Sequence, residues 1–193
     1  MNFSTIPPWN AQGVLPPVNP ASPVSVDRSP YLVPLADLIL QYGTSPDRQA
    51  ILKGLLGFRQ ALHQAGLVHG FQWLNGSFLE HIESIESRPP KDIDVVTFYH
   101  PPLNITEESL VSQNPRLFNA ELTKEDYRVD AHFVQLDPQN TNSQDLEYLI
   151  ELTTYWYSVW SHRRDYLWKG YLQIELAPDE DSSALENLLT IKP

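Results

Sequence analysis

Apolar residues recur at helical spacing in three parts of the chain. Residues 31–42 carry leucine and isoleucine three and four positions apart, which predicts a short helix. Residues 45–66 repeat this spacing between a Ser-Pro pair suited to a helix start and a terminal glycine. Residues 143–161 form a third helix, and we expect one side of it to carry Leu146, Leu149, Ile150, Thr153, Tyr157 and Trp160.

Four shorter segments read as strands, and most of them alternate apolar and polar residues: 67–74, 92–99, 127–136 and 170–176. Between the first two, residues 78–85 predict a helix whose inward side carries Phe78, Leu79, Ile82 and Ile85. Residues 101–124 are polar, and a helix start is expected at Thr106. No internal repeat is visible, and the order of elements predicts an α/β (α+β) protein.

Residues 1–30 contain seven of the 17 prolines among small polar residues. This composition predicts an extended arm that packs on the surface or stays mobile, and a partner-binding arm is the alternative. The length of 193 residues and the 41% hydrophobic content suit one domain with a real core. We therefore expect an arm over residues 1–30 and a single domain over residues 31–193.

Two aspartates, Asp92 and Asp94, alternate with branched apolar residues in the second predicted strand. Side chains alternate across a strand, so both carboxylates should leave the same face. Two carboxylates side by side on one face repel each other unless a cation lies between them. Their oxygens suit Mg²⁺ or Mn²⁺. A calcium loop is disfavoured, because Val96 and Thr97 stand where an oxygen ligand and a glycine are needed. Surface acids on an edge strand are the remaining alternative.

Asp130 adds a third acid, in the middle of the next predicted strand and on the same face as His132. An unpaired charge beside a core is costly, so an acid at this position is unusual. Three acids on two neighbouring strands could hold two divalent ions about 3.5 to 4 Å apart, the spacing used in phosphoryl chemistry. Alternatively, Asp130 is the partner of an arginine and His132 makes a structural hydrogen bond.

Gly76 and Ser77 follow the first predicted strand. A glycine lets a triphosphate approach the backbone, and Ser77 with the first amides of a helix near residue 78 could bind an anion. Gly-Ser is also a common turn dipeptide, which is the simpler interpretation.

The order of a Gly-Ser pair, a helix, Asp-x-Asp on a strand and a later Asp on a strand resembles the nucleotidyltransferase fold of DNA polymerase beta-like enzymes, in its minimal bacterial form. The resemblance covers residues 71–136, about a third of the chain. It implies a mixed sheet flanked by helices, with Gly76 and Ser77 on the nucleotide phosphates. It also implies that Asp92 and Asp94 ligate both metals and that Asp130 completes the site.

The segment between Ser77 and Asp92 is slightly longer than in compact members of that family, with the extra length in residues 86–91. The amino-acid sequence around this segment also resembles that of small bacterial proteins known only as nucleotidyltransferase-like. The resemblance therefore implies a chemistry without naming a substrate.

The one concentration of positive charge lies in residues 161–169, after the third predicted helix. Arg163, Arg164 and Lys169 could neutralise a triphosphate or a leaving pyrophosphate. The alternative is that a helix carboxyl terminus simply favours cations. The aromatic residues before this cluster are expected in the core, with base stacking as the alternative: Tyr155, Trp156 and Trp160.

Composition narrows the class of partner. The formal net charge of −11 argues against general DNA binding, although bound metal ions can reverse the local charge at a nucleotide site. The sequence has no cysteine, which excludes disulfides, thiolate zinc sites and thiol nucleophiles. No signal peptide or membrane span is visible, so we expect a cytoplasmic protein.

The sequence therefore predicts a transferase that moves a nucleoside monophosphate from an NTP such as ATP to an acceptor hydroxyl, with Mg²⁺ or Mn²⁺ as cofactor. The acceptor can be a protein, an RNA end, a small molecule or another nucleotide. A binding protein of the same fold, such as an antitoxin or regulatory subunit, is the competing class. Metal-dependent phosphoester hydrolysis is a third possibility.

Overall fold

The structure is a computed structural model that describes residues 3–136 and 142–192. It has a mixed α/β architecture with a five-stranded sheet in the order β1-β5-β2-β3-β4. The strands are β1 (Tyr31–Leu32), β2 (Gly70–Asn75), β3 (Ile93–Tyr99), β4 (Val129–Gln135) and β5 (Leu172–Glu175). Strand β2 pairs antiparallel with β3 and β5, whereas β3 pairs parallel with β4 and β1 pairs parallel with β5, so the sheet is mixed.

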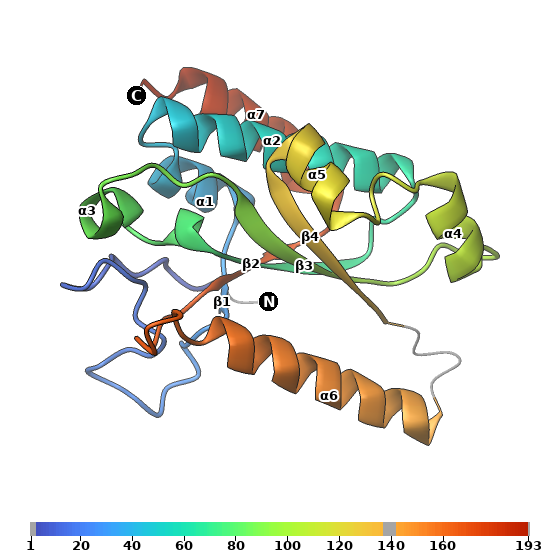
Figure 1. The fold of residues 1–193 in the computed structure, drawn as a ribbon, viewed down its shortest axis with the longest axis horizontal. Coiled ribbons are helices and arrows are strands. Elements are labelled where there is room, and N and C mark those ends of the chain that lie inside the picture. The colour runs from blue at the N-terminus through green and yellow to red at the C-terminus, as the bar shows by residue number, and fades with distance from the viewer. Residues whose placement is uncertain (1–2, 137–141, 193) are drawn as a thin grey trace.

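The helices lie on both faces of the sheet (Figure 1). Four cover one face: α1 (Leu35–Tyr42), α2 (Pro46–Gln64), α5 (Ala120–Tyr127) and α7 (Asp181–Thr190). The long helix α6 (Ser143–Trp160) crosses the opposite face. Shorter helical segments occur in the connections: η1 (Ser77–Leu79), α3 (Ile82–Glu86), α4 (Glu107–Gln113) and η2 (Pro178–Glu180).

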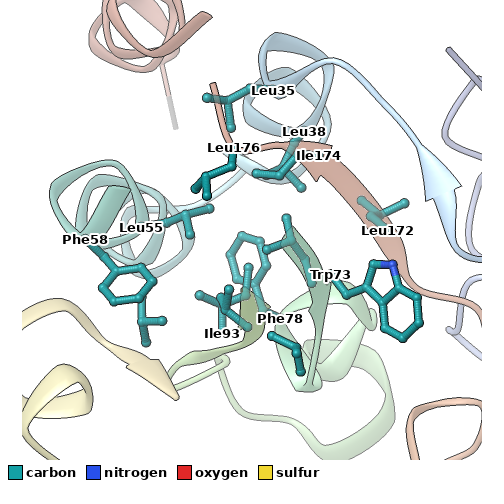
Figure 2. Close-up of a cluster of buried hydrophobic side chains, with 14 of the residues drawn as sticks. Leu35, Leu38, Leu55, Phe58, Trp73, Phe78, Ile93, Leu172, Ile174 and Leu176 are labelled. Atoms are coloured by element: carbon teal, nitrogen blue, oxygen red, sulfur yellow. The ribbon is translucent and has the colours of Figure 1, made fainter. Parts of the chain in front are cut away.

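The main core fills the space between the sheet and the four helices that cover one of its faces (Figure 2). Side chains from α1, α2 and β5 meet there, and the fully buried members include Leu38, Leu55, Phe58, Leu172 and Ile174. The helical spacing read from the sequence explains this packing, because one stripe of each helix faces the alternate residues of the strands. At the start of α2 the Ser45 side chain accepts a hydrogen bond from the Arg48 amide, as predicted for a cap.

The expected helix over residues 31–42 is wrong in its first turn. Tyr31 and Leu32 form β1 instead, and helix α1 begins only at Leu35. Two causes act together. Pro34 disfavours a helical conformation at the preceding residue, and the amides of Tyr31 and Val33 donate to carbonyls of residues 171 and 173 beside β5.

The single helix expected over residues 78–85 is also wrong. The chain makes the three-residue turn η1, then an extended residue at Glu80 with φ −99° and ψ 155°, and then α3. Phe78, Leu79 and Ile82 are buried as predicted, but Ile85 is 36% exposed. The break occurs where Glu80 turns inward to meet two cations, described below.

Helices α5 and α7 were not predicted from the sequence. Helix α5 occupies the end of the polar segment, capped by Asn119, so the third predicted strand begins at Val129 rather than at Tyr127. Helix α4 starts after Thr106 as expected, with the Thr106 side chain accepting from the Ser109 amide.

The proline-rich segment packs on the domain. Val14 and Leu15 are buried, and the Trp9 ring stacks on His81 at 4.6 Å between ring centroids. The indole nitrogen of Trp9 also donates to the Leu79 carbonyl at 2.7 Å. Residues 3–30 therefore buttress the segment that follows β2.

Helix α6 has the predicted bounds and a capping box at Asn142, but the expected interior side is only partly interior. Trp160 is buried and Trp156 half-buried, whereas Leu146, Ile150 and Tyr157 are 51%, 58% and 41% exposed. The core assignment of Tyr155 is wrong, because its side chain is 57% exposed. None of the described helices combines the length and the apolar character needed to cross a membrane.

Candidate functional site

The three aspartates predicted as a site meet at one end of the sheet. Asp94 is the register partner of Asp130 across the parallel pair β3–β4, and of Asn75 across the antiparallel pair β2–β3. Asp92 lies one residue before β3. Because the neighbours Ile93 and Val95 are buried in the core, the alternation of the strand turns both carboxylates to the face that α6 crosses.

These carboxylates line a cavity of about 640 Å³. The cavity is open to solvent, and the last turn of α6 and the segment after it form another part of its wall. All eight residues proposed from the sequence line it: Gly76, Ser77, Asp92, Asp94, Asp130, Arg163, Arg164 and Lys169.

At the acidic end of the cavity a lysine lies between two of the aspartates. Lys124 Nζ is 2.6 Å from Asp130 Oδ2 and 3.3 Å from Asp92 Oδ2. Lys124 is the fifth residue of α5, and the αL residue Arg128 then turns the chain into β4. This contact could not be predicted from the sequence, since a lysine in a polar segment is ordinarily a solvated side chain.

Asp94 has no such partner within the described part of the chain. Its burial, together with the charges of Asp92 and Asp130, raises the pKa of this carboxyl to about 6. The two lysines nearby, Lys169 and Lys124, lower the pKa but do not cancel the increase. A partly protonated, desolvated carboxyl is thus held at the centre of the acidic cluster.

His132 contacts Asp130 but is not among the residues that line the cavity. Its Nε2 is 3.5 Å from Asp130 Oδ1, and its ring lies 4.7 Å from that of Trp156. Burial is the main influence on its pKa, which falls below the ordinary value despite the neighbouring Asp130. A neutral imidazole packed under α6 agrees with the structural role considered for this residue.

The fit to a divalent cation depends on Lys124. Across residues 3–136 and 142–192, no three carboxylate or imidazole groups are already placed around a common metal position. The donor set is nevertheless of the right kind, with three carboxylates on adjacent strand ends and an ammonium group between two of them. The residues therefore suit Mg²⁺ or Mn²⁺ once Lys124 withdraws.

The backbone at Gly76 lies directly against Asp94. It has φ +86°, a conformation that side chains other than glycine rarely adopt, and a Cβ on it would lie 2.8 Å from Asp94 Oδ2. Ser77 begins η1, which has only three residues. The helix amino terminus expected after Ser77 is therefore wrong, and any anion binding there depends on the hydroxyl and local amides rather than on a helix dipole.

The predicted cations of the cavity are organised by a buried acid that sequence reasoning missed. Glu80 is 4% exposed, and its two oxygens contact Arg163 Nη1 at 2.5 Å and Lys169 Nζ at 2.6 Å. Arg163 also contacts Glu86 at 2.9 Å, whereas Arg164 is exposed. The predicted cations are thus brought together at the cavity, but two of the three are held by a protein carboxylate.

A second residue that the sequence analysis did not identify, Arg48, holds the backbone that carries Glu80. Arg48 of α2 is 1% exposed, and its guanidinium donates to the carbonyls of Phe78 and Glu80 at 2.6 and 2.7 Å. It also makes a bidentate pair with Glu83. A buried arginine that satisfies two carbonyls fixes the backbone between Ser77 and Glu83.

Comparisons with known proteins give a family but no activity. Neither the curated proteins nor the solved structures contain a match to the chain. The sequence profile of one protein family matches residues 7–175, which include β1 to β5 and every residue of the cavity described above. The chain therefore belongs to DUF6932, a family of unknown function.

Proposed function

We propose that the protein is a metal-dependent nucleotidyltransferase that moves a nucleoside monophosphate from an NTP to an acceptor hydroxyl. One observation carries the proposal: three aspartates from two adjacent parallel strands open onto the cavity that Gly76 and Ser77 also line. Phosphoryl chemistry needs carboxylates on one side and access to a phosphate on the other, within one site. The sequence resemblance points to the same chemistry.

In this proposal Asp92, Asp94 and Asp130 hold Mg²⁺ or Mn²⁺. Such ions, when bound, neutralise charge on the transferring phosphoryl group and lower the pKa of a hydroxyl nucleophile. The Asp130 side chain is 26% exposed, so an incoming acceptor hydroxyl can reach it, and in this proposal Asp130 also orients that hydroxyl. Asp94 loses its residual proton when a cation compensates its burial.

The phosphates of the nucleotide would lie against Gly76 and Ser77. The missing side chain at Gly76 lets a phosphate approach the backbone beside Asp94, and the Ser77 hydroxyl can donate a hydrogen bond. Arg164 is exposed in the cavity wall, and its guanidinium can pair with a phosphate directly. Arg163 and Lys169 are held by Glu80, so they contribute positive potential rather than a free donor fork.

The test is transfer of labelled phosphate. The purified protein is incubated with each α-labelled NTP, Mg²⁺ or Mn²⁺, and a lysate of its native host, and the labelled product is identified. Asp92→Asn and Asp94→Asn should abolish transfer by removing a metal ligand without leaving a cavity. Asp165→Asn changes another acid of the cavity wall, one that comes from the segment after α6 and not from the strand ends, and should retain transfer. Full turnover in both strand variants would refute the proposal.

A second function is favoured by the internal ion pairs. Lys124 pairs with Asp92 and Asp130, and Glu80 pairs with Arg163 and Lys169, so these six charged groups already have partners in the protein without any ligand. A non-catalytic nucleotide-sensing or antitoxin-like subunit could keep these residues for stability alone. Calorimetry separates the two: binding of a non-hydrolysable NTP without metal dependence, with no transfer to any acceptor, would support the non-catalytic function.

A further inference from the structure

Helix α6 crosses the sheet face opposite the four-helix layer, and none of the other described helices covers its outer side (Figure 1). Its inner side carries the half-buried Leu149, Leu152 and Trp156 and the buried Trp160. An amphipathic surface helix normally keeps apolar residues on such an inner stripe and polar residues elsewhere. Helix α6 departs from that rule.

Apolar side chains continue onto both flanks of the helix, and the flank that ends at the cavity is formed by Tyr148, Tyr155 and Val159. Their exposed fractions are 62%, 57% and 43%. Spacings of seven and four residues place them in one row along the helix. We name this row the tyrosine flank, and Val159 at its end lines the cavity.

The outer crest of the helix beside this flank is acidic. Glu147 and Glu151 are exposed and four residues apart, so they lie on one side of the helix. The helix Ser143–Trp160 contains no lysine or arginine, so nothing on it compensates these charges. An apolar row bordered by uncompensated carboxylates favours a partner with positive charge beside its apolar contact surface.

We infer that the tyrosine flank is a docking surface for a partner protein that presents an apolar strip bordered by lysine or arginine. Large aromatic side chains such as tyrosine give interfaces apolar area and a hydrogen-bonding tip. Carboxylates at the rim attract a basic partner and repel an acidic one. Because Val159 borders the cavity, the docked partner lies at the cavity mouth. The inference does not rest on the proposed activity.

Charge disfavours the other occupants. A second copy of this chain would bring like charges together, since the protein has a formal net charge of −11 and the crest itself is acidic. Nucleic acid and anionic lipid are repelled for the same reason, because both bind through basic side chains. A protein surface with an apolar strip and basic residues beside it complements both the apolar and the acidic side chains of α6.

The probe is an amphipathic helical peptide of leucine and lysine, compared with one that has glutamate at every lysine position. We expect the full-length protein to bind the lysine peptide at least about tenfold more tightly, measured by fluorescence anisotropy. Tyr148→Ser with Tyr155→Ser keeps every charge and should weaken this binding at least about fivefold. Leu185→Ser with Leu189→Ser, on exposed residues of α7, is the matched control and should leave it unchanged.

Three results would overturn the inference. The first is equal affinity for the lysine and glutamate peptides. The second is unchanged binding in the Tyr148 and Tyr155 variant, which would leave only a general attraction to an acidic protein. The third is a dimer in light scattering that the same two substitutions dissociate, which would assign the flank to a second copy. Circular dichroism of each variant confirms that α6 is retained.

Discussion

Gly76 lies against the carboxylate of Asp94, so closely that a Cβ on the glycine would be 2.8 Å from Oδ2. Asp94 is in β3, and Gly76 directly follows β2, whose last residue Asn75 is the register partner of Asp94. The backbone at Gly76 has φ +86°, which strains any other side chain. The position and conformation of Asp94 are therefore tied to the absence of a side chain at residue 76.

Gly76→Ala should displace Asp94 and reduce both stability and metal binding. The positive φ costs about 1 kcal/mol or more, and the Cβ contact adds to it. Gly57→Ala is the matched control, because a Cβ there meets only Tyr127 ring carbons at 3.5 and 3.7 Å inside helix α2. The control should be neutral or stabilising by about 0.5 to 1 kcal/mol. Urea denaturation compares the two, and equal effects would show that Gly76 is an ordinary turn residue.

The pH dependence of stability should report on Asp94. Its pKa is near 3.8 when unfolded and about 6 in the folded protein, so the folded state binds more protons between these values. Stability contributed by this group therefore falls as pH rises through that window, by about 3 kcal/mol in total above pH 6. Asp94→Asn removes the loss and should melt at or above the wild-type temperature at pH 7.

Asp126→Asn gives the opposite sign as a control. Its hydrogen bond with Arg116 lowers the pKa of Asp126, so that group contributes stability above its unfolded pKa and loses it on acidification. Melting curves from pH 4 to pH 8 measure both variants. A large destabilisation by Asp94→Asn at pH 7 would mean that Asp94 belongs to a structural hydrogen-bond network, and the catalytic proposal would lose its main residue.

The sequence predicted the parts of this site that depend on local periodicity. Alternation in residues 92–99 placed Asp92 and Asp94 on one face, and the register with Asp130 follows once β3 and β4 pair in parallel. The long helices α2 and α6 were predicted for the same reason, since their cap residues and the spacing of their apolar residues are local signals. These features need no knowledge of distant contacts.

The parts that failed depend on partners far away in the chain. Tyr31 becomes a strand residue because it meets Leu172, and the helix after Ser77 breaks because Glu80 reaches Arg163 and Lys169. Helical spacing on α6 was read as core, although the body of the protein covers only its inner stripe. Periodicity records which residues can be buried together, while tertiary contacts decide which of them are.

Removing Lys124 should strengthen metal binding by the protein without nucleotide. Its ammonium occupies the space between Asp92 and Asp130, so a divalent cation must displace it and work against its charge. Lys124→Met should raise the affinity for Mn²⁺ about fivefold, equivalent to about 1 kcal/mol for one charge at this distance in a wet site. Electron paramagnetic resonance of free Mn²⁺ gives the affinity directly.

Lys53→Met is the control for that experiment, because Lys53 is exposed on α2 and remote from the cavity. It changes the net charge by the same amount and should barely alter the affinity. A Lys124→Met protein that binds Mn²⁺ no better than the control would mean that the aspartates do not form a metal site, and that Lys124 is their permanent partner.

Glu80 should be the costliest acid of the cavity to neutralise. Its carboxylate is 4% exposed and pairs with both Arg163 and Lys169. Glu80→Gln therefore leaves the buried Lys169 without its carboxylate partner, and Arg163 with only its contacts to Glu86 and Asp165. Breaking a buried pair in this way costs about 3 to 5 kcal/mol. Glu86→Gln alters another acid on the same arginine, but Glu86 is 39% exposed and water replaces its contact. Urea denaturation should therefore show a large loss for Glu80→Gln and almost none for Glu86→Gln. If the two variants are equally stable, Arg163 and Lys169 are not held by Glu80, and both are free to bind a phosphate.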